Sequence, residues 1–253
     1  MALDLKNRFN LLIDKFFEIK NKGYVKGINN NKTNSCGLTF ESLLGKKPDS
    51  KYLPDYEEIE IKCKQRFSRY NISLFNLAFD GPYQYEANQL LKKYGKKESF
   101  FNRRKTLVVS LKINERVFFN KYYFELNIDK NNELLYVNIY NKYGKFLEKR
   151  CFLYFESIKK RVEIKLTNLA LIRASKKKEN NDLYFRYYKI TCYVLKDSST
   201  FISEIEKGNI VCGIMLRYSR SEKDYGKNKN KNMTFSISEY KLYKIYNKVY
   251  EFE

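Results

Sequence analysis

The chain has 253 residues, of which 43% are hydrophobic and 17% aromatic, so it can bury a sizeable core and is not disordered throughout. Its 50 Lys and Arg outnumber its 29 Asp and Glu, and the formal net charge of +21 indicates an anionic partner, of which nucleic acid is the commonest. The sequence has no histidine, which excludes Ser-His-Asp triads, Cys-His pairs and Cys/His zinc sites, so catalytic groups and metal ligands must come mainly from carboxylates, lysines and tyrosines.

Helical and extended patterns are mixed in the first part of the chain. Apolar residues recur at helical spacing over 5–17 and again over 38–44, and a glycine, a common helix terminator, follows each segment. Residues 59–62 alternate between apolar and charged side chains as in a strand, and 72–75 predict its partner strand. A Gly-Pro pair at 81–82 marks a turn before a further helix.

The rest of the chain contains more strands than helices. Strands are expected at 105–113, 120–128, 133–140, 183–195 and 210–218, with a short one through 235–237. Helices are expected at 153–162 and 238–247. We find no internal repeat and no clear linker, so we expect a mixed α/β (α+β) chain that forms a single domain, 1–253, with two lobes over about 1–150 and about 151–253.

Residues 54–62 bring two carboxylates and a lysine close together in the sequence. Because side chains alternate on a strand, Glu60 and Lys62 point to one face while the isoleucines beside Glu60 point to the core. A turn after Pro54 would fold the carboxylate of Asp55 toward Glu60. In phosphodiester hydrolysis, two carboxylates and a backbone carbonyl suffice to hold Mg²⁺, and a nearby lysine can orient the attacking water.

Taken alone, this motif is weak. An Asp followed by Glu-x-Lys is expected by chance about once in a chain so rich in Lys and Glu. A second Glu-Ile-Lys, at 163–165, lacks the Pro-Asp turn upstream, and we interpret it as a solvated edge. In isolation, 54–62 therefore fits an ordinary turn and strand at least as well as a catalytic centre.

The surroundings of this segment resemble a known family. Gly-Leu-Thr-Phe-Glu-Ser-Leu-Leu-Gly at 37–45 is followed by Leu-Pro-Asp at 53–55, Ile-Glu-Ile-Lys at 59–62, Ser-Leu-Phe-Asn at 73–76 and then Pro82. This ordered set resembles the core signature of the MvaI/BcnI restriction endonuclease family, which is related to the mismatch-repair nicking enzyme MutH. The resemblance is patchier farther along the chain.

The resemblance implies a restriction-endonuclease-like fold, in which a mixed central sheet is flanked by helices. A mainly catalytic lobe and a mainly DNA-recognition lobe would lie around a DNA cleft. By resemblance, Asp55, Glu60 and the backbone carbonyl of Ile61 would hold Mg²⁺, for which Mn²⁺ can substitute, and Lys62 would be the catalytic lysine. Glu41 would reach the same site from a helix, although it also fits a charge that complements the helix dipole.

Basic residues near these motifs are expected to contact DNA. Phosphate contacts set register and affinity, whereas base-edge contacts set specificity. We assign Lys64, Arg66, Arg69, Arg103 and Arg104 to phosphates, and Arg217, Arg220, Lys223, Asp224 and Tyr225 to a DNA groove. The family's Asp-His-Gly is here Asp-Tyr-Gly, at 224–226, which leaves the target sequence open. Any one of these lysines and arginines could equally be a solvated surface charge. An AT-rich genome would also account for part of the high lysine content.

The sequence thus predicts a Mg²⁺-dependent type II restriction endonuclease that cuts double-stranded DNA at a short specific sequence. The alternatives are a MutH-like nickase and a non-catalytic basic DNA-binding protein. We expect a monomer, as is frequent in the family, with the cognate DNA methyltransferase as a separate protein. No apolar run approaches the roughly 20 residues that span a bilayer. The N-terminus also lacks the basic segment followed by an apolar segment that is typical of a signal peptide. We therefore expect a cytoplasmic location without membrane contact.

Overall fold

The computed structural model of the chain describes residues 2–29, 34–45, 53–81, 83–98, 104–218 and 232–253. The chain divides into two compact units, a first unit of 1–72, 162–197 and 242–253 and a second unit of 73–161 and 198–241. The chain passes between them at 72/73, 161/162, 197/198 and 241/242. The expected boundary near residue 150 coincides with none of these crossings. Within the described residues, no helix is long and apolar enough to cross a membrane.

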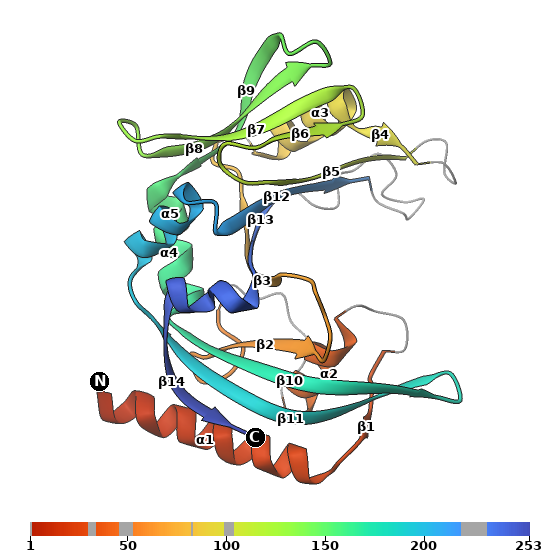
Figure 1. The fold of residues 1–253 in the computed structure, drawn as a ribbon, viewed down its shortest axis with the longest axis vertical. Coiled ribbons are helices and arrows are strands. Elements are labelled where there is room, and N and C mark those ends of the chain that lie inside the picture. Colours follow the sequence, from red (N-terminus) through yellow and green to blue (C-terminus); the bar gives the residue numbers. More distant parts are fainter. Residues whose placement is uncertain (1, 30–33, 46–52, 82, 99–103, 219–231) are drawn as a thin grey trace. The chain divides into compact units, whose positions relative to one another are not determined.

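The first unit is built on a five-stranded mixed sheet (Figure 1). Its strands are β1 (Val25–Lys26), β11 (Asp182–Leu195), β10 (Asn168–Glu179) and β2 (Glu60–Gln65) in that order, with β14 (Tyr246–Phe252) also paired to β11. Strand β2 runs parallel to β10, and the other pairs are antiparallel. Strand β2 ends this order of strands, so one of its two edges is not paired with another strand of the described sheet.

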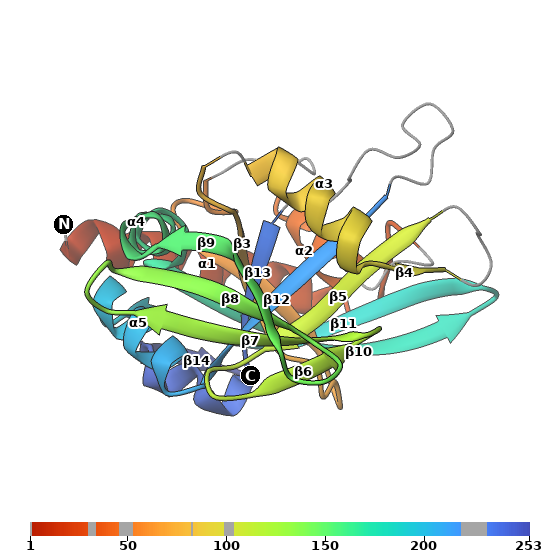
Figure 2. The same cartoon turned by 90° about the horizontal axis from the view of Figure 1, so that it is seen from above.

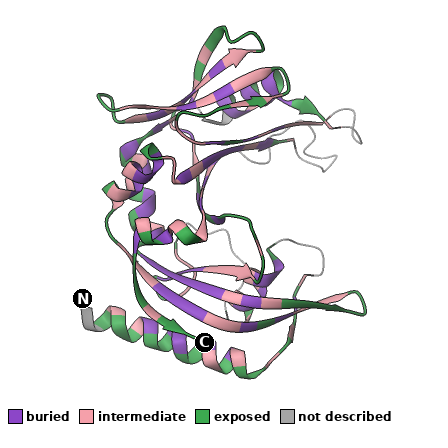
Figure 3. Cartoon of the chain, in the orientation of Figure 1, coloured by how far each residue is buried: buried purple, intermediate pink, exposed green. Residues whose placement is uncertain are grey.

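Two helices pack against this sheet. Helix α1 (Ala2–Asn21) buries the apolar stripe that the helical spacing predicts, whereas its other side is exposed (Figure 3). Helix α2 (Ser35–Leu43) joins the same core through Phe40, whose ring centroid lies 4.9 Å from that of Tyr187 on β11. Both helices therefore share one hydrophobic core with β2, β10 and β11.

The register between β2 and β10 decides which way the charged residues point. Ile61 lies beside Ala170, and both belong to the core under α1 and α2. Glu60 pairs with Leu169 and Lys62 with Leu171, so these residues face the opposite side of the sheet. The predicted alternation, with the charged pair on one face and the isoleucines in the core, is confirmed.

The second unit contains two further sheets (Figure 2). One is ordered β3 (Ile72–Ala78), β13 (Asn232–Ile237), β12 (Ile210–Arg217), β5 (Lys105–Leu111) and β4 (Lys96–Lys97), and the other β6 (Arg116–Phe119), β7 (Tyr122–Asp129), β8 (Leu134–Asn141) and β9 (Phe146–Tyr154). Its helices are α3 (Tyr83–Tyr94), α5 (Ser198–Glu206) and most of α4 (Phe155–Leu166). Phe75 stacks on Phe235 at 4.7 Å and lies 5.5 Å from Phe201, which ties β3, β13 and α5 into one core.

The predicted mixed α+β class and most predicted elements are confirmed, but three predictions about elements are wrong. The strand at 72–75 is not the partner of 59–62, because β3 pairs with β13 while β2 pairs with β10. The closing helix at 238–247 is only a 3₁₀ helix, η1 (Glu239–Lys244), which is followed by β14. Glu-Ile-Lys at 163–165 is not a solvated edge but the last turn of α4. The sequence also does not predict strands β1, β4, β6, β9 and β10, of which β10 is the partner of β2.

Candidate active site

A tight turn precedes β2. Tyr56 and Ile59 form an isolated antiparallel bridge, in which the Tyr56 N–H donates to the Ile59 carbonyl at 3.0 Å and the Ile59 N–H donates back at 2.6 Å. The two residues between them, Glu57 and Glu58, have φ of 41° and 63°. Positive φ at both central residues defines a type I′ turn, which normally contains Asn, Asp or Gly. Two glutamates held in this conformation store backbone strain, a feature that clusters at functional sites.

This turn folds Asp55 back along β2. Asp55 Oδ2 accepts a hydrogen bond from the Ile61 N–H at 3.0 Å. An extended residue presents its N–H and its C=O to the same side of the strand, so the Ile61 carbonyl faces the unpaired edge together with Asp55. The structure therefore brings the Asp55 carboxylate onto the Ile61 backbone at one edge of β2, whereas the sequence predicts a turn that folds it toward Glu60.

Glu60 is a buried carboxylate between two ammonium groups. Only 1% of it is exposed, Oε1 accepts a hydrogen bond from Lys62 Nζ at 2.6 Å, and Oε2 lies 3.2 Å from Lys165 Nζ. Burial raises the pKa of the Glu60 carboxyl, and nearby Asp55 adds to the rise, whereas both lysines oppose it. Two cations thus hold a carboxylate that would be costly to bury as an unpaired charge.

Lys165 is the member of this cluster that sequence reasoning missed. It comes from the end of α4, and its side chain is only 14% exposed. The available signal was the spacing of Ile158, Val162 and Leu166, which are all fully buried and continue the helical repeat past residue 162. This repeat indicates that the helix predicted at 153–162 continues for one more turn, which includes Lys165.

Glu41 lies at the interface between α2 and β2. A methyl group built on Gly37 would be 3.6 Å from Glu41 Oε1 and 3.9 Å from the Cβ of Cys63. Burial is the largest cause of the raised pKa of the Cys63 thiol, followed by Cys36, and both Glu41 and Asp55 add to the rise. Glu41 therefore shares the neighbourhood of Cys63 with Asp55, one residue beyond Lys62 on β2.

The donor set at this edge fits a hard divalent cation held by few protein ligands. Within the described residues, no three His, Cys, Asp or Glu side chains gather at one point, so a cage made of side chains alone is not formed there. Glu60 Oε2 is fully buried, and its contact with Lys165 does not have hydrogen-bond geometry, which leaves that oxygen without a hydrogen-bond donor among the described residues. Two carboxylates and a backbone carbonyl form the kind of set with which Mg²⁺ keeps several waters.

The predicted DNA contacts fall in two places. In the first unit, Lys64 is half-buried on β2, and Arg66 and Arg69 are exposed just beyond it. In the second unit, Arg217 ends β12 opposite Thr106 on β5, two residues from Arg104. Arg103, Arg220, Lys223, Asp224 and Tyr225 lie outside the described residues.

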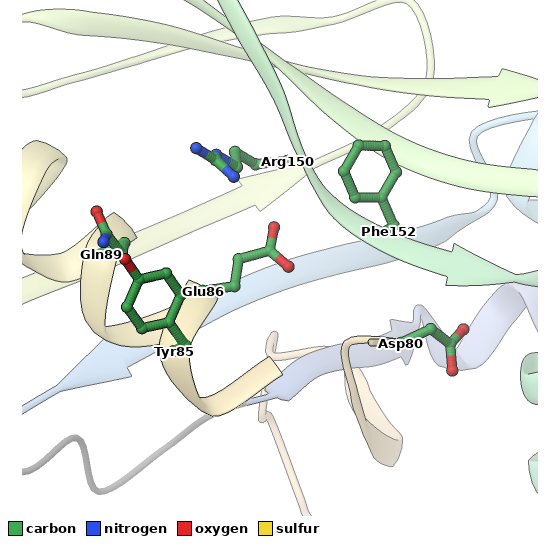
Figure 4. Close-up of a pocket in the computed structure, with 6 residues that line it drawn as sticks. All are labelled: Asp80, Tyr85, Glu86, Gln89, Arg150 and Phe152. Carbon is green, nitrogen blue, oxygen red and sulfur yellow. The ribbon is translucent and has the colours of Figure 1, made fainter. Parts of the chain in front are cut away.

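A cavity of about 410 Å³ in the second unit is lined by six residues of α3, β9 and the loop after β3 (Figure 4). Its carboxylates have structural partners. Glu86 accepts a hydrogen bond from the Cys151 N–H at 2.7 Å, and Asp80 accepts from the Tyr154 N–H and from Ser157 Oγ. Cys151 has a φ of 60° near a register shift between β8 and β9, so Glu86 satisfies a backbone donor that an irregular strand leaves open.

Replacing Glu86 by alanine is expected to destabilise the fold. A buried backbone N–H without a partner costs about 1–3 kcal/mol, which corresponds to a fall of about 2–12 °C in the melting temperature for a chain of this size. Thermal unfolding followed by circular dichroism measures the change. Glu115→Ala, which removes only an exposed ion pair to Lys112, is the matched control and should leave the melting temperature unchanged. An equal effect of both substitutions would refute the capping role.

Comparison with known proteins identifies the family. The model of the MvaI/BcnI restriction endonuclease family matches residues 13–246, and the chain belongs to this family. It is therefore a type II restriction endonuclease, a site-specific deoxyribonuclease. No curated protein matches the sequence.

Two solved structures of the restriction endonuclease MvaI resemble the chain. The complex of MvaI with its cognate DNA substrate is 25% identical, with a TM-score of 0.86 over 95% of this chain and 96% of that chain. MvaI in the absence of DNA is 23% identical, with a TM-score of 0.59 over 96% of each chain. The fold predicted from the sequence resemblance is confirmed by the first of these likenesses.

Proposed function

We propose that the chain cuts both strands of double-stranded DNA at a short specific sequence, with its catalytic centre at the unpaired edge of β2. The observation that carries this proposal is the hydrogen bond that Asp55 accepts from the Ile61 N–H. Next to it, the buried carboxylate of Glu60 is paired with Lys62. The similarity to MvaI, whose solved complex contains cognate DNA, supports duplex DNA as the substrate.

Asp55, Glu60 and the Ile61 carbonyl would hold Mg²⁺, with Mn²⁺ as a substitute. Bound there, the ion supplies charge stabilisation at the phosphoryl group and a water of lowered pKa. The type I′ turn fixes Asp55 and the paired strands fix Glu60, so both carboxylates are held on a rigid frame before DNA binds. We assign the neighbouring Glu41 to the same centre, where its carboxylate would act through water.

Lys62 and Lys165 have different roles in this proposal. Lys62 donates to Glu60 from the same face of β2, and one of its remaining N–H donors would orient the attacking water or contact the phosphate. Lys165 approaches Glu60 from α4 and fixes the position of the carboxylate. Glu60 is thus held from two sides, which limits the motion of a proposed metal ligand.

The predicted DNA contacts divide between positioning and sequence reading. Lys64, Arg66, Arg69, Arg103 and Arg104 would contact phosphates, and Arg217, Arg220, Lys223, Asp224 and Tyr225 would face base edges. The +21 charge supports strong electrostatic attraction to DNA, which should weaken steeply with salt. We further propose a monomer that acts in the cytoplasm beside a separate DNA methyltransferase of the same specificity.

Removal of the metal should abolish cleavage. Supercoiled plasmid incubated with the protein and Mg²⁺ should give discrete linear fragments, and excess EDTA should slow the reaction by at least about 1,000-fold, because the ion contributes several kcal/mol to transition-state stabilisation. Mn²⁺ added in excess over EDTA should restore cutting at the same positions. Open circles alone would show a nickase instead, and retarded but intact DNA would show a binding protein without catalysis.

A further inference from the structure

Two aromatic side chains are exposed to solvent directly after β2. Phe67 is 87% exposed and Tyr70 is 86% exposed, the highest values among the large hydrophobic side chains of the described residues. They belong to the connection that links β2 to β3. Neither ring contributes to the core, so packing does not explain why aromatic residues are present here.

The backbone conformation at Phe67 is unusual for an aromatic residue. Its φ is +67°, a left-handed conformation that a bulky aromatic residue rarely adopts. The connection itself is ordered: the Arg66 N–H donates to the Ala174 carbonyl at 2.8 Å and the Ser68 N–H donates to the Gln65 carbonyl at 3.1 Å. Phe67 is therefore displayed on a fixed turn where glycine or asparagine would be less strained.

The charges around the rings match a polyanion. Residues 61–79 contain four Lys and Arg and no Asp or Glu. The Arg66 guanidinium lies over the Phe67 ring, 5.2 Å from its centroid, and Arg69 is also exposed. Nucleic acid combines negative phosphates with flat apolar bases, so it can satisfy the cations and the rings together.

The connection is also within reach of DNA bound at the catalytic centre. Phe67 follows Lys62 by five positions, which is roughly 16 Å of extended chain at about 3.3 Å per residue. Successive phosphates of one DNA strand are about 3.4 Å apart along the helix axis. The Phe67 ring therefore lies close enough to Lys62 to reach a duplex cut there, at a base step within about five nucleotides of the scissile bond.

On these grounds, and resting on the proposed function, we infer that Phe67 is a DNA wedge: its ring enters a base step of the duplex close to the cleaved bond. Arg66 and Arg69 bind the flanking phosphates, and Tyr70 contacts the adjacent sugar-phosphate backbone. Apolar side chains that enter a base step unstack it partially and deform the duplex, so the wedge favours sites whose steps open easily.

Substitution of Phe67 by glycine separates this role from a structural one. Because glycine relieves the left-handed strain, the melting temperature should rise by about 2–4 °C. Loss of the stacking contact should weaken DNA binding by about tenfold or more. Phe67→Trp should keep the affinity. A residue needed only for folding would instead lower the melting temperature when replaced, and that result would refute the wedge.

The unstacking itself can be measured with duplexes that carry the mapped cleavage site and a 2-aminopurine at successive positions within about five nucleotides of the cut. Without metal, the intact protein should increase the fluorescence at one step, and Phe67→Gly should not, even at saturating protein. Tyr143→Ala, which removes an 81% exposed ring beside Lys142, is the matched control and should behave like the intact protein. Unchanged fluorescence with a protein that binds and cuts would refute the wedge alone, whereas a protein that neither binds nor cuts DNA would also refute the proposed function.

Discussion

Glu60→Gln is expected to abolish DNA cleavage while leaving DNA binding intact. The substitution keeps the shape of a side chain that is 1% exposed, but it removes the charge that pairs with Lys62 and Lys165 and that would hold the metal. Loss of the proposed metal ligand and of this charge should slow the single-turnover rate at least about 1,000-fold, which corresponds to about 4 kcal/mol of transition-state stabilisation. Binding to the cleavage site in EDTA, measured by gel retardation, should change by less than about threefold, since phosphate contacts supply most of the affinity.

The control for Glu60 is Glu57→Gln. Glu57 is an exposed glutamate in the same turn, outside the proposed donor set, and its amide variant should cut at the normal rate. A Glu60→Gln protein that cuts within about tenfold of the normal rate would contradict the assignment of Glu60 as a metal ligand. Equal loss in both variants would show that the whole turn is sensitive to charge.

Lys62→Met should be nearly as damaging, and comparison with Lys165→Met should show which ammonium acts on the substrate. Both nitrogens contact Glu60, at 2.6 Å and 3.2 Å, and both side chains are largely buried, at 22% and 14% exposure. Loss of a group that orients water and stabilises developing charge should reduce the rate about 100- to 1,000-fold. Loss of a residue that only positions Glu60 should reduce it about 10- to 100-fold.

Arginine replacements make this comparison sharper. Lys165→Arg keeps a cation beside Glu60 and should restore much of the rate that Lys165→Met loses. Lys62→Arg should not restore the rate, because the planar guanidinium cannot take the place of a compact ammonium beside the reacting phosphate. If Lys165→Met proved more damaging than Lys62→Met, the two roles would be reversed.

The local part of the site could be predicted from the sequence, because it depends on short-range geometry. Alternation along one strand places Glu60 and Lys62 on one face, and the turn after Pro54 folds Asp55 back along β2, although its contact is with the Ile61 N–H and not with Glu60. Lys165 could not be found in this way, because its contact depends on where α4 ends relative to β2. Its Glu-Ile-Lys triplet has the pattern of a strand motif, but the helical spacing of the buried residues around it places Lys165 on the last turn of α4.

Strand pairing between distant parts of the chain explains why the predictions for 72–75 and 238–247 are wrong. The apolar residues at 72–75 predict a partner strand for 59–62, but the partner of β2 is β10, which lies far along the chain and runs parallel to it. No local pattern specifies a parallel partner, because such strands are joined by long crossovers. Similarly, the spacing at 238–247 is helical only through the 3₁₀ turn, after which pairing with β11 imposes the extended form of β14.

The most direct test of the proposed catalytic centre is to map where a bound metal ion cleaves the polypeptide. The protein is incubated with Fe²⁺ in place of Mg²⁺, ascorbate and peroxide are added, and mass spectrometry locates the breaks that bound iron makes in the polypeptide. The account predicts breaks confined to the turn and strand around Asp55 and Glu60–Ile61, suppressed by excess Mg²⁺ and lost in Glu60→Gln. Breaks elsewhere in the chain that Mg²⁺ suppresses, with residues 55–62 intact, would contradict it.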